Sequence, residues 1–397
     1  MHNNIALLDD IRVLELAGAP AHAICGRYFA DLGAQVVMLE APRSGSPLRF
    51  TGPFLDDLPG PDRSGLFLYT ATGKFGVTLD YRHPEGAAIL RRLLAQADLV
   101  IDNGDLAGGQ VSIDWREINP RLVLLDLRKF SRGGEYENYL ATELQSAAMG
   151  GWMAQLGEPG RNPLITNSLT CVSFVAGVVG ASAALAAVMR ARSGGEGCHV
   201  ELSDHEALLA CTRYNETYFS YTGTEIKRCG KSFTGWTPTY RIFEAADGFV
   251  SCAASTDAQV ESFMTLAGVS SDRFATREER YEHGSELVEK LNAWTSSHSR
   301  NEVFHQAQAW RVPMGSVATV DEVFDSEQLK ERGFFDLIDH PATGSRRYPG
   351  VPVLVDGRRP VPVRRAPMLG EHNGQIFCDE LGLSRKELLA LAEMGVV

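Results

Sequence analysis

Residues 12–40 read RVLELAGAPAHAICGRYFADLGAQVVMLE, and this stretch predicts how the chain begins to fold. RVLEL (12–16) and QVVMLE (35–40) are apolar runs of the length and composition typical of buried strands. Between them a helical pattern covers about 21–32 and ends before Gly33, a residue that suits the position after a helix. Strand, helix, strand in this order predicts two parallel strands joined by a crossover helix.

The same pattern returns further along the chain. VTLDY (77–81), DLVID (98–102) and RLVLLDL (121–127) are predicted strands, and a helix is predicted over 84–97, opening with a proline at its first position. Near-continuous apolar strands that alternate with helices are typical of a parallel sheet covered on both faces. We therefore expect an α/β, Rossmann-like domain.

The texture changes near residue 225, after which a smaller α+β unit is expected. YRIFEAADGFVSCAAS (240–255) is a predicted hairpin with Asp247-Gly248 as its turn, and Asp257 is the expected cap of the next helix. Ser384 and Glu387 form a predicted capping box for a final helix. The other expected elements are helices at 137–156 and 169–192, a strand entering a helix at 199–210, helices at 285–294 and 301–310, and an extended segment at 346–355.

Composition excludes several classes of protein. The chain has 397 residues and a formal net charge of −12, with no basic run, so neither nucleic acid nor an anionic membrane surface is an expected partner. Seven cysteines without a CxxC pair favour reduced thiols, and the start MHNNIALLDD does not resemble a signal peptide. We therefore expect a cytoplasmic protein with no metal, since His199 and His205 have no neighbours at ligand spacing.

The residues themselves raise two alternatives, a membrane span and a dinucleotide site. Residues 171–189 are uncharged over 19 positions, long enough to cross a membrane, but ten of them are Gly, Ala or Ser, which favours a core helix buried on all sides. The turn from Gly18 to Gly26 is not GxGxxG, so Glu40, which ends the second strand, is weak support for dinucleotide binding.

Four longer segments carry a family resemblance. RVLELAGAPAHAICGRYFADLGAQVVMLEAPRSGSPLR (12–49), GKFGVTLDYRHPEGAAILRRLLAQADLVIDN (73–103), INPRLVLLDLRKFS (118–131) and RARSGGEGCHVELSDHEALL (190–209) resemble class III CoA-transferases in order and spacing. This family includes formyl-CoA transferase, carnitine CoA-transferase and α-methylacyl-CoA racemase. The similarity continues to the C-terminus through ADGFVSCAAS, RVPMGSVATVDEV, APMLGEH and ELGLS.

The resemblance implies a fold and a set of partners. It implies a large Rossmann-like domain built from both chain ends (1–224 and 330–397), a smaller inserted domain (225–329), and two interlocked subunits. The implied substrates are an acyl-CoA and a carboxylic acid, with no tightly bound cofactor. The implied assembly is a homodimer or a heteromer with a related CoA-transferase subunit.

The chain departs from the family at its catalytic residue. The family uses an aspartate that attacks the acyl-CoA thioester and then carries CoA as an aspartyl thioester, which is covalent catalysis. That aspartate lies four residues before a glycine, and counting back from Gly177 reaches Ser173. No Asp or Glu occurs anywhere in 159–195. Ser173, Cys171 and Thr170 at this place, and Glu143 as a base, are the candidate catalytic residues; the histidine of the racemase branch falls on Thr142.

The resemblance also implies positions that contact CoA. A lysine that the family keeps before the catalytic helix is Leu140 here, which removes one cation. The implied CoA-binding positions are Ala19, Pro20, Ala21, Ala41, Arg43, Leu79, Arg82 and Asn103.

Three functions remain open from the sequence. The first is a CoA-transferase that moves CoA between an acyl-CoA and an organic acid with an altered catalytic residue. The second is a silent subunit paired with an aspartate-bearing paralogue. The third is an acyl-CoA binding protein.

Overall fold

The computed structural model describes residues 5–164, 171–232, 237–360 and 364–397, apart from the side chains of 212–214. Its contacts form two compact units, here called the large unit (Met1–Gly150, Thr166–Arg213 and Gln328–Val397) and the small unit (Gly151–Ile165 and Tyr214–Glu327). These contact boundaries do not coincide with the domain boundaries expected at 224/225 and 329/330. The contact boundary at 213/214 falls inside helix α8 (Asp204–Thr222), about ten residues before the change in sequence pattern near 225.

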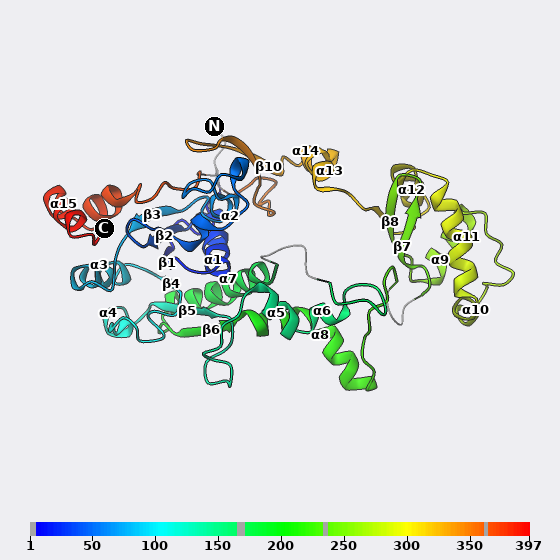
Figure 1. Ribbon diagram of the computed structural model, residues 1–397, viewed down its shortest axis with the longest axis horizontal. Coiled ribbons are helices and arrows are strands. Elements are labelled where there is room, and N and C mark those ends of the chain that lie inside the picture. Colours follow the sequence, from blue (N-terminus) through cyan, green and yellow to red (C-terminus); the bar gives the residue numbers. More distant parts are fainter. Residues whose placement is uncertain (1–4, 165–170, 233–236, 361–363) are drawn as a thin grey trace. The chain divides into compact units, whose positions relative to one another are not determined.

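The large unit contains a six-stranded sheet in the order β3-β2-β1-β4-β5-β6 (Figure 1). Every pair of neighbouring strands in it is parallel, which confirms the predicted sheet. The strand order reverses between β1 and β4, and such a switch point opens a crevice at the carboxyl ends of the strands. The strands are β1 (Arg12–Leu16), β2 (Gln35–Glu40), β3 (Phe75–Thr78), β4 (Leu99–Asp102), β5 (Val123–Arg128) and β6 (His199–Ser203).

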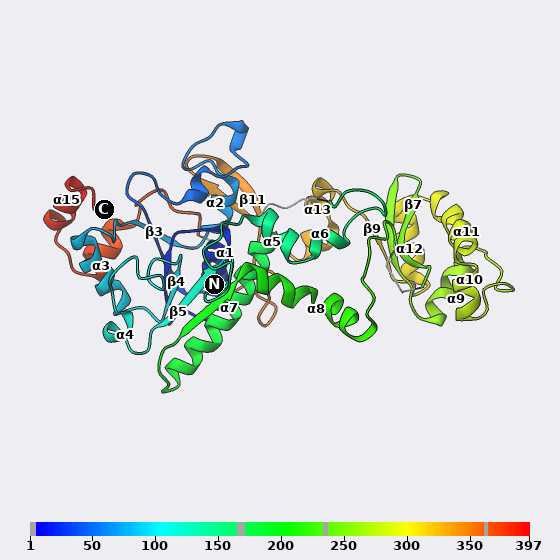
Figure 2. The same ribbon diagram turned by 60° about the horizontal axis from the view of Figure 1, so that its bottom comes forward.

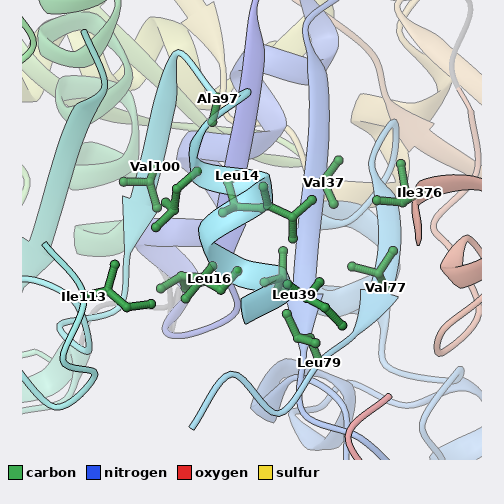
Figure 3. Close-up of a cluster of buried hydrophobic side chains, with 14 of the residues drawn as sticks. Leu14, Leu16, Val37, Leu39, Val77, Leu79, Ala97, Val100, Ile113 and Ile376 are labelled. Atoms are coloured by element: carbon green, nitrogen blue, oxygen red, sulfur yellow. The ribbon is translucent and has the colours of Figure 1, made fainter. Parts of the chain in front are cut away.

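Alternate side chains of the strands enter two separate cores, one on each face of the sheet. Leu14 and Leu16 of β1 belong to one core, together with residues of α3 and of the C-terminal segment (Figure 3). Val13 belongs to the other core, together with residues of α1 and α7. Figure 2 shows α7 running alongside β5, against which it packs. Apolar strands buried on both faces thus explain the sequence pattern.

The remaining elements of the large unit connect the strands or cover the sheet. They are α1 (Pro20–Asp31), η1 (Pro47–Phe50), η2 (Leu55–Asp57), α2 (Gly65–Thr70), α3 (Pro84–Leu94), α4 (Trp115–Ile118), α5 (Glu143–Met149), α7 (Cys171–Arg192), the hairpin β10 (Phe335–His340) and β11 (Gly344–Pro349), the π-helical turn η3 (Gly374–Glu380) and α15 (Arg385–Glu393). Helix α14 (Glu327–Glu331) lies at the boundary between the units.

The small unit has its own core between an antiparallel sheet and helices. The sheet has the order β7-β8-β9, and the core joins it to α9, α11 and α12. The elements are α6 (Trp152–Gln155), β7 (Tyr240–Ala245), β8 (Gly248–Ala253), α9 (Asp257–Leu266), α10 (Arg277–Glu282), α11 (Gly284–Ser296), α12 (Arg300–Ala309), β9 (Met314–Ser316) and α13 (Val320–Asp325).

Local details of the predicted elements needed correction. The expected helix at 137–156 is two short helices, α5 and α6, because Gly151 has φ 74° and breaks the hydrogen-bond ladder. In the hairpin Ala245 pairs with Gly248, so the turn residues are 246 and 247. Thr256 caps α9, and Asp257 is its first residue. The capping box of Ser384 and Glu387 is confirmed.

Two further predicted elements differ from the observed ones. The expected strand at 77–81 is β3 (Phe75–Thr78), because residues 79–81 already turn toward α3. The extended segment expected at 346–355 contributes β11, which pairs antiparallel with β10. That pairing was missed because β11, GSRRYP, is polar and largely exposed and so lacks the apolar signal of a strand.

Helix α7 is buried on one side rather than on all sides. Its buried residues follow a single stripe that includes Val172, Ala176, Gly180, Ala184 and Val188. Met189, by contrast, is 62% exposed. The expectation of burial all round was wrong, since α1 and the sheet of the large unit cover only this stripe. Among the described residues α7 is the one helix long and apolar enough to cross a membrane, a property that core helices share.

A buried carboxyl on β4 predicts a pH dependence of stability. Burial raises the pKa of Asp102 to about 6, although its carboxylate accepts hydrogen bonds from the backbone N–H groups of Leu106 and Ala107. The native state therefore binds this proton more tightly than the unfolded state does, and stability is lost as pH rises from about 4 to about 6.

Replacing Asp102 by asparagine removes this titration. Between pH 4.5 and pH 7.5, the difference in unfolding free energy between variant and wild type should move in favour of Asp102→Asn by about 2 kcal/mol. Urea titrations at the two pH values measure it. A shift in favour of the wild type would contradict the assignment.

Candidate active site

A cavity of about 820 Å³ lies at the carboxyl ends of the parallel strands, entirely within the large unit. We call it the switch-point cavity, because β1 and β4 both end at it. Its volume falls within the range of small-molecule sites in proteins. Segments that follow all six strands contribute to its lining, which consists of Ala17–His22, Pro47, Leu48, Thr51, Arg82, Asn103, Asp105, Leu127–Phe130, Glu137, Tyr139, Ala141–Glu143 and Asp204.

Glu143 brings a carboxylate to the first turn of α7. One of its oxygens, Oε2, accepts a hydrogen bond from the backbone N–H of Val172 at 3.0 Å. The other, Oε1, accepts from the backbone N–H of Ser173 at 3.2 Å and from the Ser173 hydroxyl. The Glu143 side chain is 14% exposed and lines the switch-point cavity. Burial raises the pKa of this carboxyl, so part of its acidity is lost despite these donors.

The local sequence explains why Glu143 points there. Thr142 is the N-cap of α5 and forms a capping box with Gln145. Its backbone N–H donates to the side-chain oxygen of Gln145, and this contact fixes where the helix begins. Glu143 is then the first helical residue, and its side chain spans to the first turn of α7. Thr142 therefore has a structural role at the position where the racemase branch carries its histidine.

Lys129 provides a cation beside this carboxylate. It follows β5, and its Nζ lies 3.9 Å from Oε1 of Glu143 and forms a closer ion pair with Asp204. Asp204 is 2% exposed and opens α8 directly after β6. The ends of two neighbouring strands thus place one lysine between two carboxylates.

A second group of polar side chains lies at the ends of β3 and β4, where Arg82, Asn103 and Asp105 line the cavity. Arg82 is paired with Asp105 at 2.8 Å, and the Tyr81 hydroxyl donates to the same carboxylate at 2.6 Å. Asn103 donates to the backbone oxygen of Ala17, which follows β1. The Arg82 side chain is 62% exposed, so it can exchange its partner for a ligand phosphate.

Two further groups belong to the cavity wall. His22 is buried, with Nδ1 3.2 Å from the oxygen of Ala19 and Nε2 3.0 Å from the oxygen of Leu127, and burial lowers its pKa. Arg128 donates to the carboxylate and the backbone oxygen of Glu137. The backbone N–H of Gly133, which also binds Glu137, lowers the pKa of that carboxyl.

The structure brings together only some of the predicted catalytic residues. Ser173 and Glu143 are in direct contact, and Ser173 is fully buried behind the glutamate. Cys171 is partly exposed, but burial and the nearby Glu143 raise its thiol pKa, which disfavours a thiolate nucleophile. Thr170 lies outside the described residues.

The predicted CoA-binding positions likewise separate into two groups. Ala19, Pro20, Ala21, Arg82 and Asn103 line the switch-point cavity. Three others do not: Ala41 and Arg43 are exposed, and Leu79 is a core residue.

Glu40 is unavailable to a nucleotide ribose. It is 1% exposed, and Arg49 donates to its two oxygens at 2.6 and 2.8 Å. The acid that ends the second strand therefore has a structural partner, which removes the support it gave to the dinucleotide alternative.

Lys129, Asp204, Asp105 and Tyr81 were missed as site residues. Lys129, Asp204 and Asp105 follow predicted strands within a few residues, in the segments RKF, SDH and NGD, and Tyr81 is the last residue of the strand predicted at 77–81. The rule that ligands bind at the carboxyl ends of parallel strands could have selected all of them. Among the described residues no group of three or more His, Cys, Asp or Glu side chains is arranged to hold a metal ion.

Fold and site together define an α/β protein with a cavity at the switch point of a parallel sheet. Residues 8–373 match the sequence profile of CoA-transferase family III, and the chain belongs to that family. The resemblance to class III CoA-transferases seen in the sequence is thereby confirmed.

Curated relatives align over nearly the whole chain. A succinate–glutarate CoA-transferase of Agrobacterium fabrum is 28% identical over 96% of this chain and 97% of its own length. A protein named succinyl-CoA–L-malate CoA-transferase beta subunit, from Chloroflexus aurantiacus, is 25% identical over 98% of each chain. Among solved structures, a CAIB/BAIF family protein from Brucella suis superposes with a TM-score of 0.80 at 27% identity, covering 95% of this chain and 100% of that one.

Proposed function

We propose that this chain is a CoA-transferase that binds an acyl-CoA in the switch-point cavity and moves its CoA to a carboxylic acid. The observation that carries the proposal is the cavity itself, whose lining includes the cations Arg82, Arg128 and Lys129 and to which Glu143 brings a carboxylate at the first turn of α7. The reaction requires a site for the anionic CoA of the acyl-CoA substrate. It also requires a carboxylate in that site to which CoA can be transferred. CoA and the acid are substrates in this proposal, and no tightly bound cofactor is needed.

The charge pattern suggests how the substrate lies. Arg82 is exposed at the cavity mouth and suits a phosphate of CoA, while Lys129 lies deeper, near the carboxylates. Phosphates toward Arg82 place the thioester end toward Glu143 and Lys129. The acceptor acid is then expected at Lys129, whose charge attracts its carboxylate.

This placement predicts a loss of CoA affinity when Arg82 is changed. Arg82→Met should raise the Kd for CoA about tenfold and weaken its dependence on salt concentration, because one charge-assisted contact is lost. Isothermal titration with CoA alone measures both effects. The matched control is Arg116→Met, since Arg116 lies over the Trp115 ring and does not line the cavity. Equal affinities of the two variants would refute the proposed orientation.

A heteromer is the second candidate. No Asp or Glu occurs in 159–195, where the family resemblance places the catalytic acid, and one relative is named as a beta subunit. A silent subunit would bind CoA but show no transfer by itself, and would gain activity when co-expressed with an aspartate-bearing paralogue. Transfer by the purified single chain would exclude it.

We also propose that the large unit pairs with a second chain. Leu140 is 99% exposed, Met189 62% and Tyr139 58%, and Leu144 and Met149 of α5 are also exposed. Four of these side chains lie within residues 139–149, and exposed apolar side chains gathered together are typical of an interface. Light scattering coupled to size exclusion should report at least a dimer, and a monomer at micromolar concentration would contradict this.

A further inference from the structure

Ser173 and Glu143 form a hydrogen-bonded pair, which the absence of the family aspartate does not by itself predict. The serine is fully buried and donates its hydroxyl and its backbone N–H to the glutamate. Glu143 therefore holds a carboxylate at the place in space where the first turn of α7 would present one from residue 173. Unlike the serine, this carboxylate lines the switch-point cavity and can meet a substrate.

We propose that Glu143 is the covalent carboxylate of the reaction, an inference that rests on the proposed CoA-transferase function. Its oxygen attacks the thioester carbonyl, the C–S bond breaks, and CoA leaves as a thiolate with the electron pair. The product is a mixed anhydride between Glu143 and the acyl group. The thiolate then attacks the Glu143 carbonyl, the acyl group leaves as a carboxylate, and a glutamyl-CoA thioester remains.

The second half of the reaction reverses these steps with the acceptor. The acceptor carboxylate attacks the glutamyl thioester and releases the CoA thiolate, which gives a second mixed anhydride. The thiolate attacks the acceptor carbonyl of that anhydride, forming the new acyl-CoA and freeing the Glu143 carboxylate. No oxidant, reductant or ATP is consumed, and the proton count is unchanged.

The donors around Glu143 match the charge that these steps develop. When a thiolate attacks the glutamyl carbonyl, negative charge grows on a carboxyl oxygen, and the Oε2 position already accepts from the N–H of Val172 at 3.0 Å and from that of Ser173 at 3.3 Å. Fixed donors aimed at a developing oxyanion are usually a large part of catalysis. The positive charge of Lys129 at 3.9 Å adds to this effect.

The other carboxylates of the cavity are less suited to the role. Asp105 is held by Arg82 and Tyr81, and Asp204 by Lys129. Glu137 is held by Arg128 and by the N–H of Gly133, which lower its basicity. Among these four, only Glu143 accepts hydrogen bonds from the first turn of a long helix. There the N–H groups of Val172 and Ser173 can bind an oxyanion.

Chemical trapping tests the inference directly. The purified chain is incubated with succinyl-CoA, glutaryl-CoA or formyl-CoA, quenched with hydroxylamine, digested and mapped by tandem mass spectrometry. An anhydride or thioester of Glu143 should appear as a glutamyl hydroxamate at residue 143. Glu143→Gln should lose this mark, with at least a tenfold lower yield.

Asp102→Asn is the matched control for the trapping experiment. Asp102 is likewise a buried carboxylate that accepts two backbone N–H groups, but it does not line the cavity, so the variant should keep the mark. If the wild type transfers CoA while the mark lies on Cys171 or elsewhere, the inference fails and the proposed function stands. If no probe is turned over or bound by the wild type, the proposed function fails and takes the inference with it.

Discussion

Glu143→Gln should lower kcat for CoA transfer by about 10³-fold or more, as removal of a covalent nucleophile commonly does. A carboxamide oxygen is too weak a nucleophile to attack a thioester, so the mixed anhydride cannot form. With its single oxygen at the Oε2 position, glutamine can still accept from the backbone N–H groups of Val172 and Ser173, so the first turn of α7 keeps a partner. Stability and the Kd for CoA should therefore stay close to those of the wild type.

A rescue experiment separates the covalent role from a structural one. Ser173→Asp in the Glu143→Gln background returns a carboxylate to the first turn of α7, at the position implied by the family resemblance. Recovery of at least tenfold in kcat would support a carboxylate requirement at the first turn of α7. Full activity of Glu143→Gln by itself would contradict the assignment of Glu143.

Arg49→Met should destabilise the chain by about 3–5 kcal/mol, the cost of removing one partner from a buried ion pair. Arg49 is fully buried, donates to both oxygens of Glu40, and also bonds Asp62 at 2.7 Å and the backbone oxygen of Pro367 at 3.1 Å. Its guanidinium lies 3.9 Å from the centre of the Phe67 ring. Methionine fills much of the volume but leaves the buried Glu40 carboxylate without its cation.

Urea unfolding with two further variants gives this prediction its controls. Adding Glu40→Leu to Arg49→Met should recover part of the loss, because the uncompensated charge is removed as well. Arg365→Met breaks a partly exposed ion pair with Glu371, whose side chains are 28% and 30% exposed, and should cost less than about 1 kcal/mol. Equal losses for Arg49→Met and Arg365→Met would contradict the buried network.

The parallel sheet could be predicted because its signal is local. The strands at 12–16 and 35–40 were placed at their observed bounds, since apolar residues that enter two cores leave a continuous run in the sequence. The hairpin at 335–349 was missed for the opposite reason, because few of its side chains are buried.

The site was less predictable because its contacts join residues far apart in the chain. Glu143 was a candidate only through the family resemblance, and its expected helix, 137–156, gave no reason for it to reach α7. The contact depends on where α5 begins, which the capping box of Thr142 and Gln145 fixes. The pairing of Lys129 with Asp204 requires β5 and β6 to be neighbours, which no sequence period reports.

The proposed transfer is tested most directly by isotope exchange between an acyl-CoA and its own acid. Purified single chain is mixed with succinyl-CoA and ¹³C-labelled succinate, and in parallel with the glutaryl and formyl pairs, and labelled acyl-CoA is followed by mass spectrometry. Such an exchange needs no knowledge of the natural acceptor, since donor and acceptor share one acyl group. The account predicts labelled acyl-CoA with at least one pair, and its loss in Glu143→Gln. Tight binding of the acyl-CoAs with no exchange in any pair would contradict the claim that this chain transfers CoA by itself.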